Sequence, residues 1–209
     1  MEKRIITISR EFGSGGRTIG KLVAEHLGIR CYDAELIQKL AAESGFDENY
    51  IKEAGEYTPG GFLASAFTNR SFGPTNEDLL WKLQYRIIRE LAEKEPCVIV
   101  GRCADFVLKG RPGVVRVFCY CDRDTAIDRC TSEYGLDKVK AEAEIKRLNK
   151  ARGTHYEYYT GQRWDDPRNY DLMINTGSMT LDQACDIIVR MYANAKASMK
   201  AAVAGCTEA

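Results

Sequence analysis

The sequence lacks the marks of several classes of protein. Its 209 residues contain no run of about 18 apolar residues that could cross a membrane, and the first residues lead directly into a predicted strand rather than a signal peptide. Thirty basic residues balance thirty acidic ones, so bulk charge predicts no affinity for nucleic acid or an anionic membrane. We therefore expect neither as a partner, and any basic site must be local.

Histidines and paired cysteine motifs are also scarce. The chain has two histidines and eight cysteines, and no C-x-x-C motif occurs, so a zinc site is not expected. Most cysteines lie inside apolar segments, as Cys97, Cys119, Cys130 and Cys185 do. This pattern indicates buried, reduced thiols in a cytoplasmic protein rather than a disulfide scaffold.

Apolar patterns of the strand and helix types alternate along residues 1–200, which we interpret as one domain followed by a frayed tail at 201–209. Helix 122–152 is expected to break at Gly135. Five strands alternating with helices predict an α/β fold with a doubly wound, parallel five-stranded sheet. The predicted strands are 3–9, 29–32, 97–100, 114–121 and 171–174, and the predicted helices are 18–27, 34–44, 79–91, 122–152 and one that starts at 180.

Ligands of such sheets bind at the carboxyl ends of the strands, which places the turns at Asp33, Gly101 and Asp122 on one rim with the first turn. Residues 45–74 show no regular pattern beyond a possible helix at 49–54. A segment this long inside a compact domain indicates a lid or binding loop. The apolar helix at 79–91 is compatible with a homodimer.

A glycine-rich turn, Gly13-Ser14-Gly15-Gly16-Arg17-Thr18, follows the first predicted strand. Strand, glycine turn and helix together bind phosphate, because backbone N–H groups and the positive end of the helix dipole converge on the anion. The usual form, G-x-x-x-x-G-K-[ST], has a lysine that reaches the terminal phosphates, and this loop has none. We therefore interpret the turn as a nucleotide-binding loop without its lysine.

The loop fits that motif in two registers. If Gly15 is the second motif glycine, Gly16 occupies the lysine position; if Gly16 is that glycine, Arg17 replaces the lysine. In both registers Thr18 supplies a hydroxyl for a magnesium ion. Because a guanidinium neutralises phosphate charge, we predict that Arg17 substitutes for the lysine, with Arg10 and Lys21 as alternatives.

Four segments resemble the cytidylate kinases, phosphate-loop enzymes that phosphorylate nucleoside monophosphates. Residues 6–28 align without gaps on the family's amino-terminal segment, where a threonine two residues after the lysine favours the register with Gly16 at the lysine position. The chain is most similar to a divergent, cytidylate kinase-like group whose loop also lacks the lysine. The other segments, 116–129, 145–152 and 173–183, resemble the family's fourth strand and following helix, its arginine-rich lid, and its closing strand and helix.

The resemblance implies a P-loop fold of the nucleoside monophosphate kinase type, with ATP as donor, magnesium as cofactor and a helical lid at about 146–166. From that lid Arg147, Lys150 and Arg152 would close over the phosphates. The region 45–95 would hold the acceptor.

The acceptor side departs from the family pattern. Asp33 keeps the family's aspartate after the second strand, but an alanine follows in place of its serine and Lys39 stands at its arginine. The family's Gly-Arg-Asp after the third strand is drawn out here to Gly101-Arg102-Cys103-Ala104-Asp105. We expect Arg102 to hold an acceptor phosphate and Asp33 or Asp105 to orient an acceptor hydroxyl, and we predict no cytosine specificity.

Two functions fit these residues. The first is an ATP-dependent phosphotransferase that acts on a small molecule, a nucleotide or nucleoside. The alternative is a regulatory or sensor protein that binds nucleotide through the lysine-less loop without catalysis. Thr18, the lid arginines and Arg102 favour the enzyme, because a sensor needs fewer groups on the acceptor side.

Overall fold

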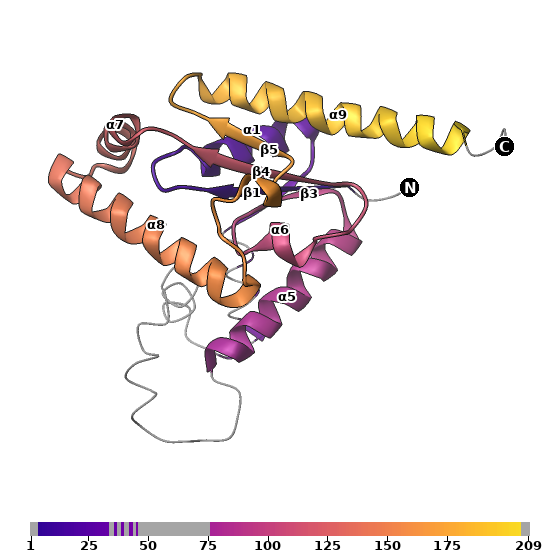
Figure 1. Ribbon diagram of the computed structural model, residues 1–209, viewed down its shortest axis with the longest axis horizontal. Helices are drawn as coiled ribbons and strands as arrows, with labels where there is room; N and C mark the ends of the chain where they lie inside the picture. The colour runs from indigo at the N-terminus through magenta and orange to yellow at the C-terminus, as the bar shows by residue number, and fades with distance from the viewer. Residues whose placement is uncertain are drawn as a thin grey trace.

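The computed structural model describes residues 4–33 and 76–205, together with Leu36, Lys39, Ala42, Glu43 and Gly45. A five-stranded sheet in the order β2-β3-β1-β4-β5 forms its centre (Figure 1). Every pair of neighbouring strands is parallel, which confirms the predicted sheet. The strands are β1 (Ile5–Arg10), β2 (Arg30–Tyr32), β3 (Cys97–Val100), β4 (Val114–Tyr120) and β5 (Leu172–Asn175).

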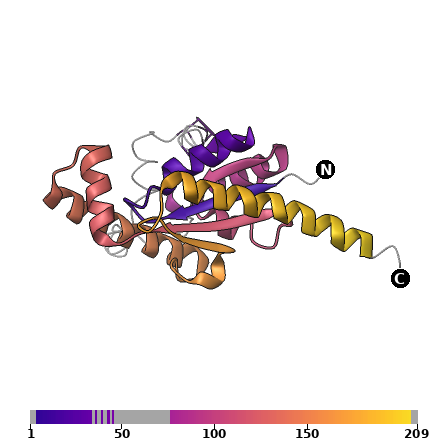
Figure 2. The same ribbon diagram turned by 90° about the horizontal axis from the view of Figure 1, so that it is seen from above.

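Helices cover both faces of the sheet. Helices α1 and α9 lie on one face and α5 and α6 on the other, while α7 and the first half of α8 lie beyond the carboxyl ends of the strands (Figures 1 and 2). The bounds are α1 (Gly16–Leu27), α5 (Asn76–Lys94), α6 (Ala104–Val107), α7 (Arg123–Tyr134), α8 (Lys138–Thr160), α9 (Leu181–Gly205) and a 3-10 turn, η1 (Pro167–Asn169).

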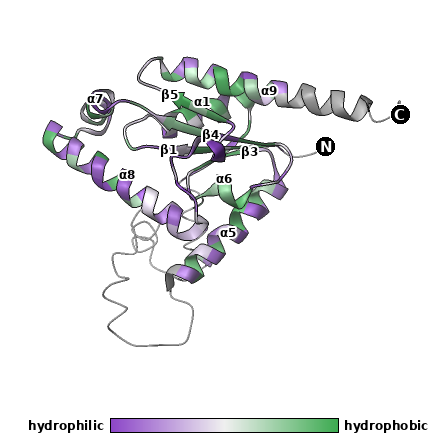
Figure 3. Ribbon diagram, viewed as in Figure 1, coloured by the Kyte–Doolittle hydropathy of each residue, from purple (hydrophilic) through white to green (hydrophobic). Residues whose placement is uncertain are grey.

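Strand β1 shows why its segment is almost continuously apolar. Ile5 packs into the cluster formed with α5 and α6, whereas Ile6 and Ile8 pack into the cluster formed with α1 and α9. Successive side chains of a strand point to opposite faces, so a strand covered on both sides needs apolar residues at every position. By contrast, α8 is mainly hydrophilic along its length (Figure 3).

The helix ends differ from the prediction in three places. Helix α1 begins at Gly16, two residues before the predicted start, so the last residues of the glycine turn form its first turn. Helix α8 continues to Thr160, well past the predicted end near Arg152. Helix α9 runs to Gly205, which places residues 201–205 of the predicted frayed tail in a helix.

The apolar side of α5 does not support the predicted homodimer. Leu80, Ile87, Ile88 and Leu91 are buried in the core against the sheet, so they are not available to a second chain. This removes the only observation from which a dimer was predicted.

Other predictions fall partly outside the described residues. Leu36, Lys39, Ala42 and Glu43 are helical, in agreement with the predicted helix at 34–44, whereas the possible helix at 49–54 lies outside the description. Within the described ranges, no helix has the length and apolarity needed to cross a membrane. The seven cysteines found there are free thiols.

Candidate functional site

The carboxyl ends of the five strands meet at one rim of the sheet, and the candidate site is built from the turns that follow them. The parallel register aligns the end of β1 with the ends of β3 and β4. The turns after these strands and after β5 carry the glycine loop, Gly101–Cys103 and Thr176. Segments far apart in the sequence therefore converge, as expected for the binding edge of such a sheet.

The glycine loop borders a cavity of about 340 Å³. Its lining combines loop backbone with three guanidinium groups and two carboxylates, a mixture suited to a charged ligand. The lining residues are Arg10, Glu11, Phe12, Gly13, Gly15, Gly16, Arg17, Asp33, Tyr134 and Arg152.

Two glycines let the loop backbone turn tightly beside this cavity. Gly13 and Gly15 have φ of 81° and 75°, a left-handed conformation that glycine adopts at little cost. The first hydrogen bond of α1 runs from Ile19 N to Gly15 O (2.9 Å), so the N–H groups of Gly16 to Thr18 have no partner within the helix, and that of Gly16 donates to Ser14 Oγ (3.4 Å). Open N–H groups and the helix dipole together make an anion site.

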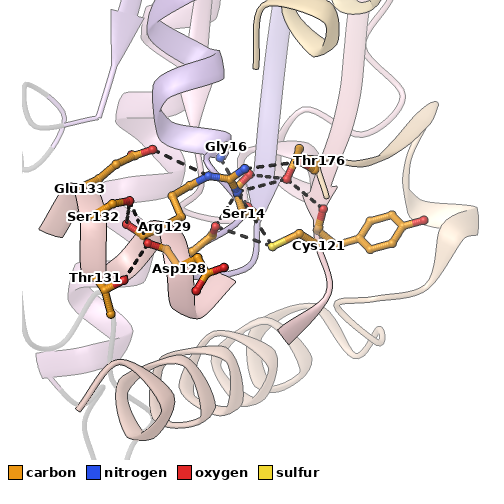
Figure 4. A network of polar contacts seen from close by, with 11 residues as sticks. Ser14, Gly16, Cys121, Asp128, Arg129, Thr131, Ser132, Glu133 and Thr176 are labelled. Atoms are coloured by element: carbon orange, nitrogen blue, oxygen red, sulfur yellow. Dashed lines mark hydrogen bonds and ion pairs between the residues drawn. The ribbon is translucent and has the colours of Figure 1, made fainter. Parts of the chain in front are cut away.

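A buried polar network fixes the loop from behind (Figure 4). Arg129, on α7, donates from Nη1 to the carbonyl of Gly13 (2.7 Å), and the Thr176 hydroxyl donates to the carbonyl of Ser14 (2.7 Å). The Ser14 hydroxyl in turn donates to Glu11 O (2.9 Å). The carbonyls of Gly13 and Ser14 are thus turned toward protein, while the N–H groups of Ser14 and Gly16 donate within the loop, to Glu11 O and Ser14 Oγ at 3.4 Å each.

Arg129 and Thr176 are site residues that no motif in the sequence indicates. Each lies more than a hundred positions from its partner in the loop, and neither forms a local motif. The only signal was their position in two segments that resemble the cytidylate kinases, 116–129 and 173–183.

The predicted lysine substitute, Arg17, lies on the outer side of the loop. Its Nε lies 2.6 Å from Asp33 Oδ2, and its side chain is 57% exposed, so its charge faces a carboxylate at the edge of the cavity. Lys21 is exposed on α1. The arrangement places Arg17 and Asp33 together, as expected of neighbours on the rim.

Thr18 is partly buried in the first turn of α1. Its hydroxyl fits the predicted role of magnesium ligand, because Mg²⁺ bound to nucleotides takes few protein oxygens and fills its shell with phosphate oxygens and water. In the described residues no group of three or more His, Cys, Asp or Glu side chains could hold a metal alone. A magnesium ion here would therefore depend on the nucleotide.

The three predicted lid residues on α8 differ in position. Arg152 lines the loop cavity, donates from Nη1 to Arg10 O (3.2 Å) and lies over the Phe12 ring at 5.7 Å. Arg147 pairs with Glu144 at 2.6 Å, and Lys150 is exposed. Only Arg152 of the three lines the cavity in this arrangement.

A second cavity adjoins the first, and both are lined by Arg10 and Arg152. The turn after β3 contributes Arg102 and Cys103, whose φ values of 57° and 52° are unusual for residues other than glycine. This strained backbone is held by Gln84, whose Nε2 donates to Arg102 O (2.8 Å). The complete lining is Ser9, Arg10, Gly101, Arg102, Cys103, Arg152, His155, Tyr156 and Trp164.

Asp105 lies behind this cavity rather than on its wall. Only 2% of the residue is exposed, and its carboxylate accepts hydrogen bonds from Tyr156 (2.6 Å) and Ser9 (3.1 Å). Burial raises the pKa of Asp105, and the two hydrogen bonds oppose that rise. The predicted direct contact with an acceptor is therefore not what this geometry provides, because the carboxylate positions Ser9 and Tyr156 instead.

Lys39 is also turned to other partners. Its ammonium lies 4.0 Å from Glu43 and 3.9 Å from Glu90. It lines neither cavity, so the structure brings Asp33 and Arg102 to the rim cavities but not Lys39.

His155 forms part of the wall of the second cavity. Burial and the neighbouring charge of Arg102 lower its pKa to about 4, so the imidazole is neutral at pH 7. Its ring packs against Trp81 and Tyr159, with centroid distances of 6.3 and 4.8 Å. The positive charge of the cavity therefore comes from arginines alone among its lining residues.

Comparison with known sequences agrees with this geometry. The sequence model of the cytidylate kinase-like family matches residues 5–178. A cytidylate kinase of Archaeoglobus fulgidus is 27% identical over 187 residues, which cover 88% of this chain and 92% of that protein. A cytidylate kinase of Methanopyrus kandleri is 23% identical over 193 residues, covering 88% and 90%.

Solved structures support the same fold. An uncharacterized protein from Eubacterium ventriosum superposes with a TM-score of 0.70 at 30% identity, covering 91% of this chain and 98% of that one. A shikimate kinase from Acinetobacter baumannii, at 14% identity, superposes with a TM-score of 0.51 and covers 92% and 93%. The second likeness concerns the fold alone.

Proposed function

The chain belongs to the cytidylate kinase-like family, and from this premise we propose that it is an ATP-dependent phosphotransferase that acts on a nucleotide or nucleoside. The observation that carries the proposal is the glycine loop at the N-terminus of α1, whose residues Gly13, Gly15 and Gly16 border a cavity with three guanidinium groups. Relatives named cytidylate kinase align along most of the chain and support an acceptor of this class.

In this proposal the loop holds the donor phosphates of ATP. Backbone amides of the loop and of the first turn of α1 would bind phosphate oxygens, and Thr18 would help to hold a magnesium ion, which would supply further neutralising charge. Phosphoryl transfer depends mainly on positioning and charge neutralisation, so few other protein groups are required. Arg152 contributes its charge from α8, and Arg147 and Lys150 would approach only if that helix moved.

The second cavity, of about 40 Å³, is our proposed place for the anionic group of the acceptor. Arg102 would bind an anionic group of the acceptor, and Asp33 would orient a hydroxyl near the loop. The acceptor oxygen forms a bond to the γ-phosphorus while the bond from that phosphorus to the bridging oxygen breaks, and the electron pair of the broken bond remains on ADP. A hydroxyl acceptor releases its proton to water, whereas a phosphate acceptor has none to release.

The first test compares two glycine variants. In Gly13→Ala a new Cβ would lie 2.8 Å from Ala126 Cβ, inside the loop network, whereas at Gly110, which has a similar φ of 78°, nothing lies within 4 Å. Both variants are destabilised because alanine is unfavourable at positive φ. Only Gly13→Ala should lose MgATP binding in titration calorimetry. Equal binding by both would contradict a donor site in the loop.

The second test measures ADP release with a panel of nucleoside monophosphates and nucleosides. We expect turnover with at least one acceptor. Binding of MgATP without turnover across the whole panel would support a nucleotide sensor and contradict the phosphotransferase.

A further inference from the structure

We propose that Arg10 supplies the positive charge that the phosphate loop lost with its lysine; this inference rests on the proposed function and names one more residue of its donor site. Arg10 is the last residue of β1 and lines both cavities. The assignment rests on the surroundings of Gly16 and Gly101, and on the finding that no described carboxylate forms an ion pair with Arg10.

The first glycine position is Gly16, where the lysine would stand in the register with Gly15 as second motif glycine. A Cβ at Gly16 would lie 2.6 Å from Arg10 Cβ and 3.1 Å from Cys119 Cβ, so no side chain fits there while Arg10 is present. In that register position 10 is the first motif glycine. In this register the chain has Gly16 at the position of the motif lysine and Arg10 at the position of the first motif glycine.

The second glycine position shows where the guanidinium lies. A Cβ at Gly101 would lie 2.0 Å from Arg10 Nη1 and 2.8 Å from Arg10 Cζ. The side chain therefore passes from the end of β1 across the face of Gly16 to the turn after β3. Its charge lies where the cavity of the glycine loop meets the cavity of Arg102.

The charge of Arg10 is also not committed to a carboxylate. Among the ion pairs of the described residues none includes Arg10, whereas Arg17 is held 2.6 Å from Asp33. An arginine beside an open anion site and without a carboxylate partner can give its full charge to phosphate oxygens. Arg17 would first have to give up Asp33, so Arg10 is the better substitute for the lysine.

This position suits phosphoryl transfer. As the acceptor oxygen bonds to the γ-phosphorus and the bridging oxygen leaves with ADP, negative charge is spread over the oxygens between donor and acceptor. A fixed cation at that point stabilises the transition state more than the separate substrates. Loss of one such group lowers turnover by about 10²- to 10³-fold.

The test exchanges the two positions. We would compare Arg10→Ala, Gly16→Lys and the double variant Arg10→Gly/Gly16→Lys, which restores the usual motif pattern, with Arg168→Ala as a control for loss of an exposed arginine on η1. Circular dichroism and thermal midpoints report folding. Gly16→Lys alone should unfold at a lower temperature because of its contact with Arg10, and the double variant should recover part of that loss.

The readouts are MgATP affinity and kcat/KM. We expect Arg10→Ala to bind MgATP about 10- to 100-fold more weakly, as for loss of a charged hydrogen bond, and the double variant to recover at least tenfold in kcat/KM over Arg10→Ala. Arg10→Ala with affinity and kcat/KM within threefold of wild type would overturn the inference. If wild type binds MgATP without transferring phosphate, the proposed function fails, and the affinity of Arg10→Ala still decides the role of Arg10.

Discussion

Replacing Tyr156 by Phe tests the buried network beneath the second cavity. The change keeps the ring, so it opens no cavity, but it removes the hydroxyl that donates to Asp105 Oδ2 at 2.6 Å. Asp105 is 2% exposed and retains the 3.1 Å hydrogen bond from Ser9. Removing one partner of a buried hydrogen bond costs about 1–3 kcal/mol, so we expect a loss of that order at neutral pH.

The loss should depend on pH in a defined direction. Burial holds the pKa of Asp105 above its usual range, so the folded state binds the proton more tightly than the unfolded chain does. The contribution of Asp105 to stability is therefore greatest below about pH 3.9 and decreases as pH rises through the folded-state pKa. Tyr156→Phe raises that pKa further. The difference in free energy of unfolding between variant and wild type is therefore largest at neutral pH, and it decreases once Asp105 is protonated in both proteins.

Urea unfolding followed by fluorescence or circular dichroism measures this difference at pH 7 and near pH 4. The control is Tyr158→Phe, whose residue is 53% exposed and should change stability by less than about 0.5 kcal/mol. A destabilisation by Tyr156→Phe that is equally large at both pH values would refute the role assigned to Asp105. So would a change at neutral pH no larger than that of the control.

Three further predictions concern the rim. Gly13→Ala should lower the free energy of unfolding in urea by about 1–3 kcal/mol, because φ is 81° and the new Cβ meets Ala126; an unchanged free energy would argue against the tight loop. Arg102→Gly should be more stable than Arg102→Ala by about 1 kcal/mol, since φ is 57°. Both variants should lose turnover to the same extent, and a variant that kept the turnover of wild type would show that Arg102 does not bind the acceptor. Burial lowers the pKa of His155 to about 4, so the free energy of unfolding of wild type should decrease as pH falls from about 6.5 toward 4, by at most about 3 kcal/mol. His155→Gln should reduce this dependence on pH, as measured by urea unfolding.

The elements that could be predicted are those with local causes. The β-branched residues of β1 and the glycines that follow predict strand and turn, and Gly28 ends α1 with φ of 62°, as a terminal glycine does. The continuous apolar run at Cys97–Val100 predicts a strand buried on both faces, and all four residues are buried. These signals lie within a few residues of the structure that they predict.

The end of α8 could not be predicted in the same way, because tertiary packing decides it. The segment after Arg152 begins with a glycine, which disfavours helix, yet Tyr156 is buried in the core and Tyr159 stacks on Trp81 with centroids 4.5 Å apart. Trp81 belongs to α5 and lies more than seventy positions before Tyr159, so tertiary contacts stabilise helix where propensity does not.

The site was predictable only where it is contiguous in sequence. The glycine loop was found as a motif, whereas Arg129 reaches Gly13 across 116 positions. Asp105 was predicted to touch the acceptor from its place after a strand. Sequence alone does not show that Tyr156, 51 positions later, covers its carboxylate.

The most direct test of the account follows the phosphorus itself. A ³¹P NMR time course would mix wild type with MgATP and, one at a time, a panel of nucleoside monophosphates and nucleosides. The account predicts that the γ-phosphate signal of ATP disappears while a new phosphate signal forms on one acceptor, and that Arg10→Ala slows this transfer. Accumulation of inorganic phosphate alone, or no change with any acceptor, would contradict a phosphotransferase.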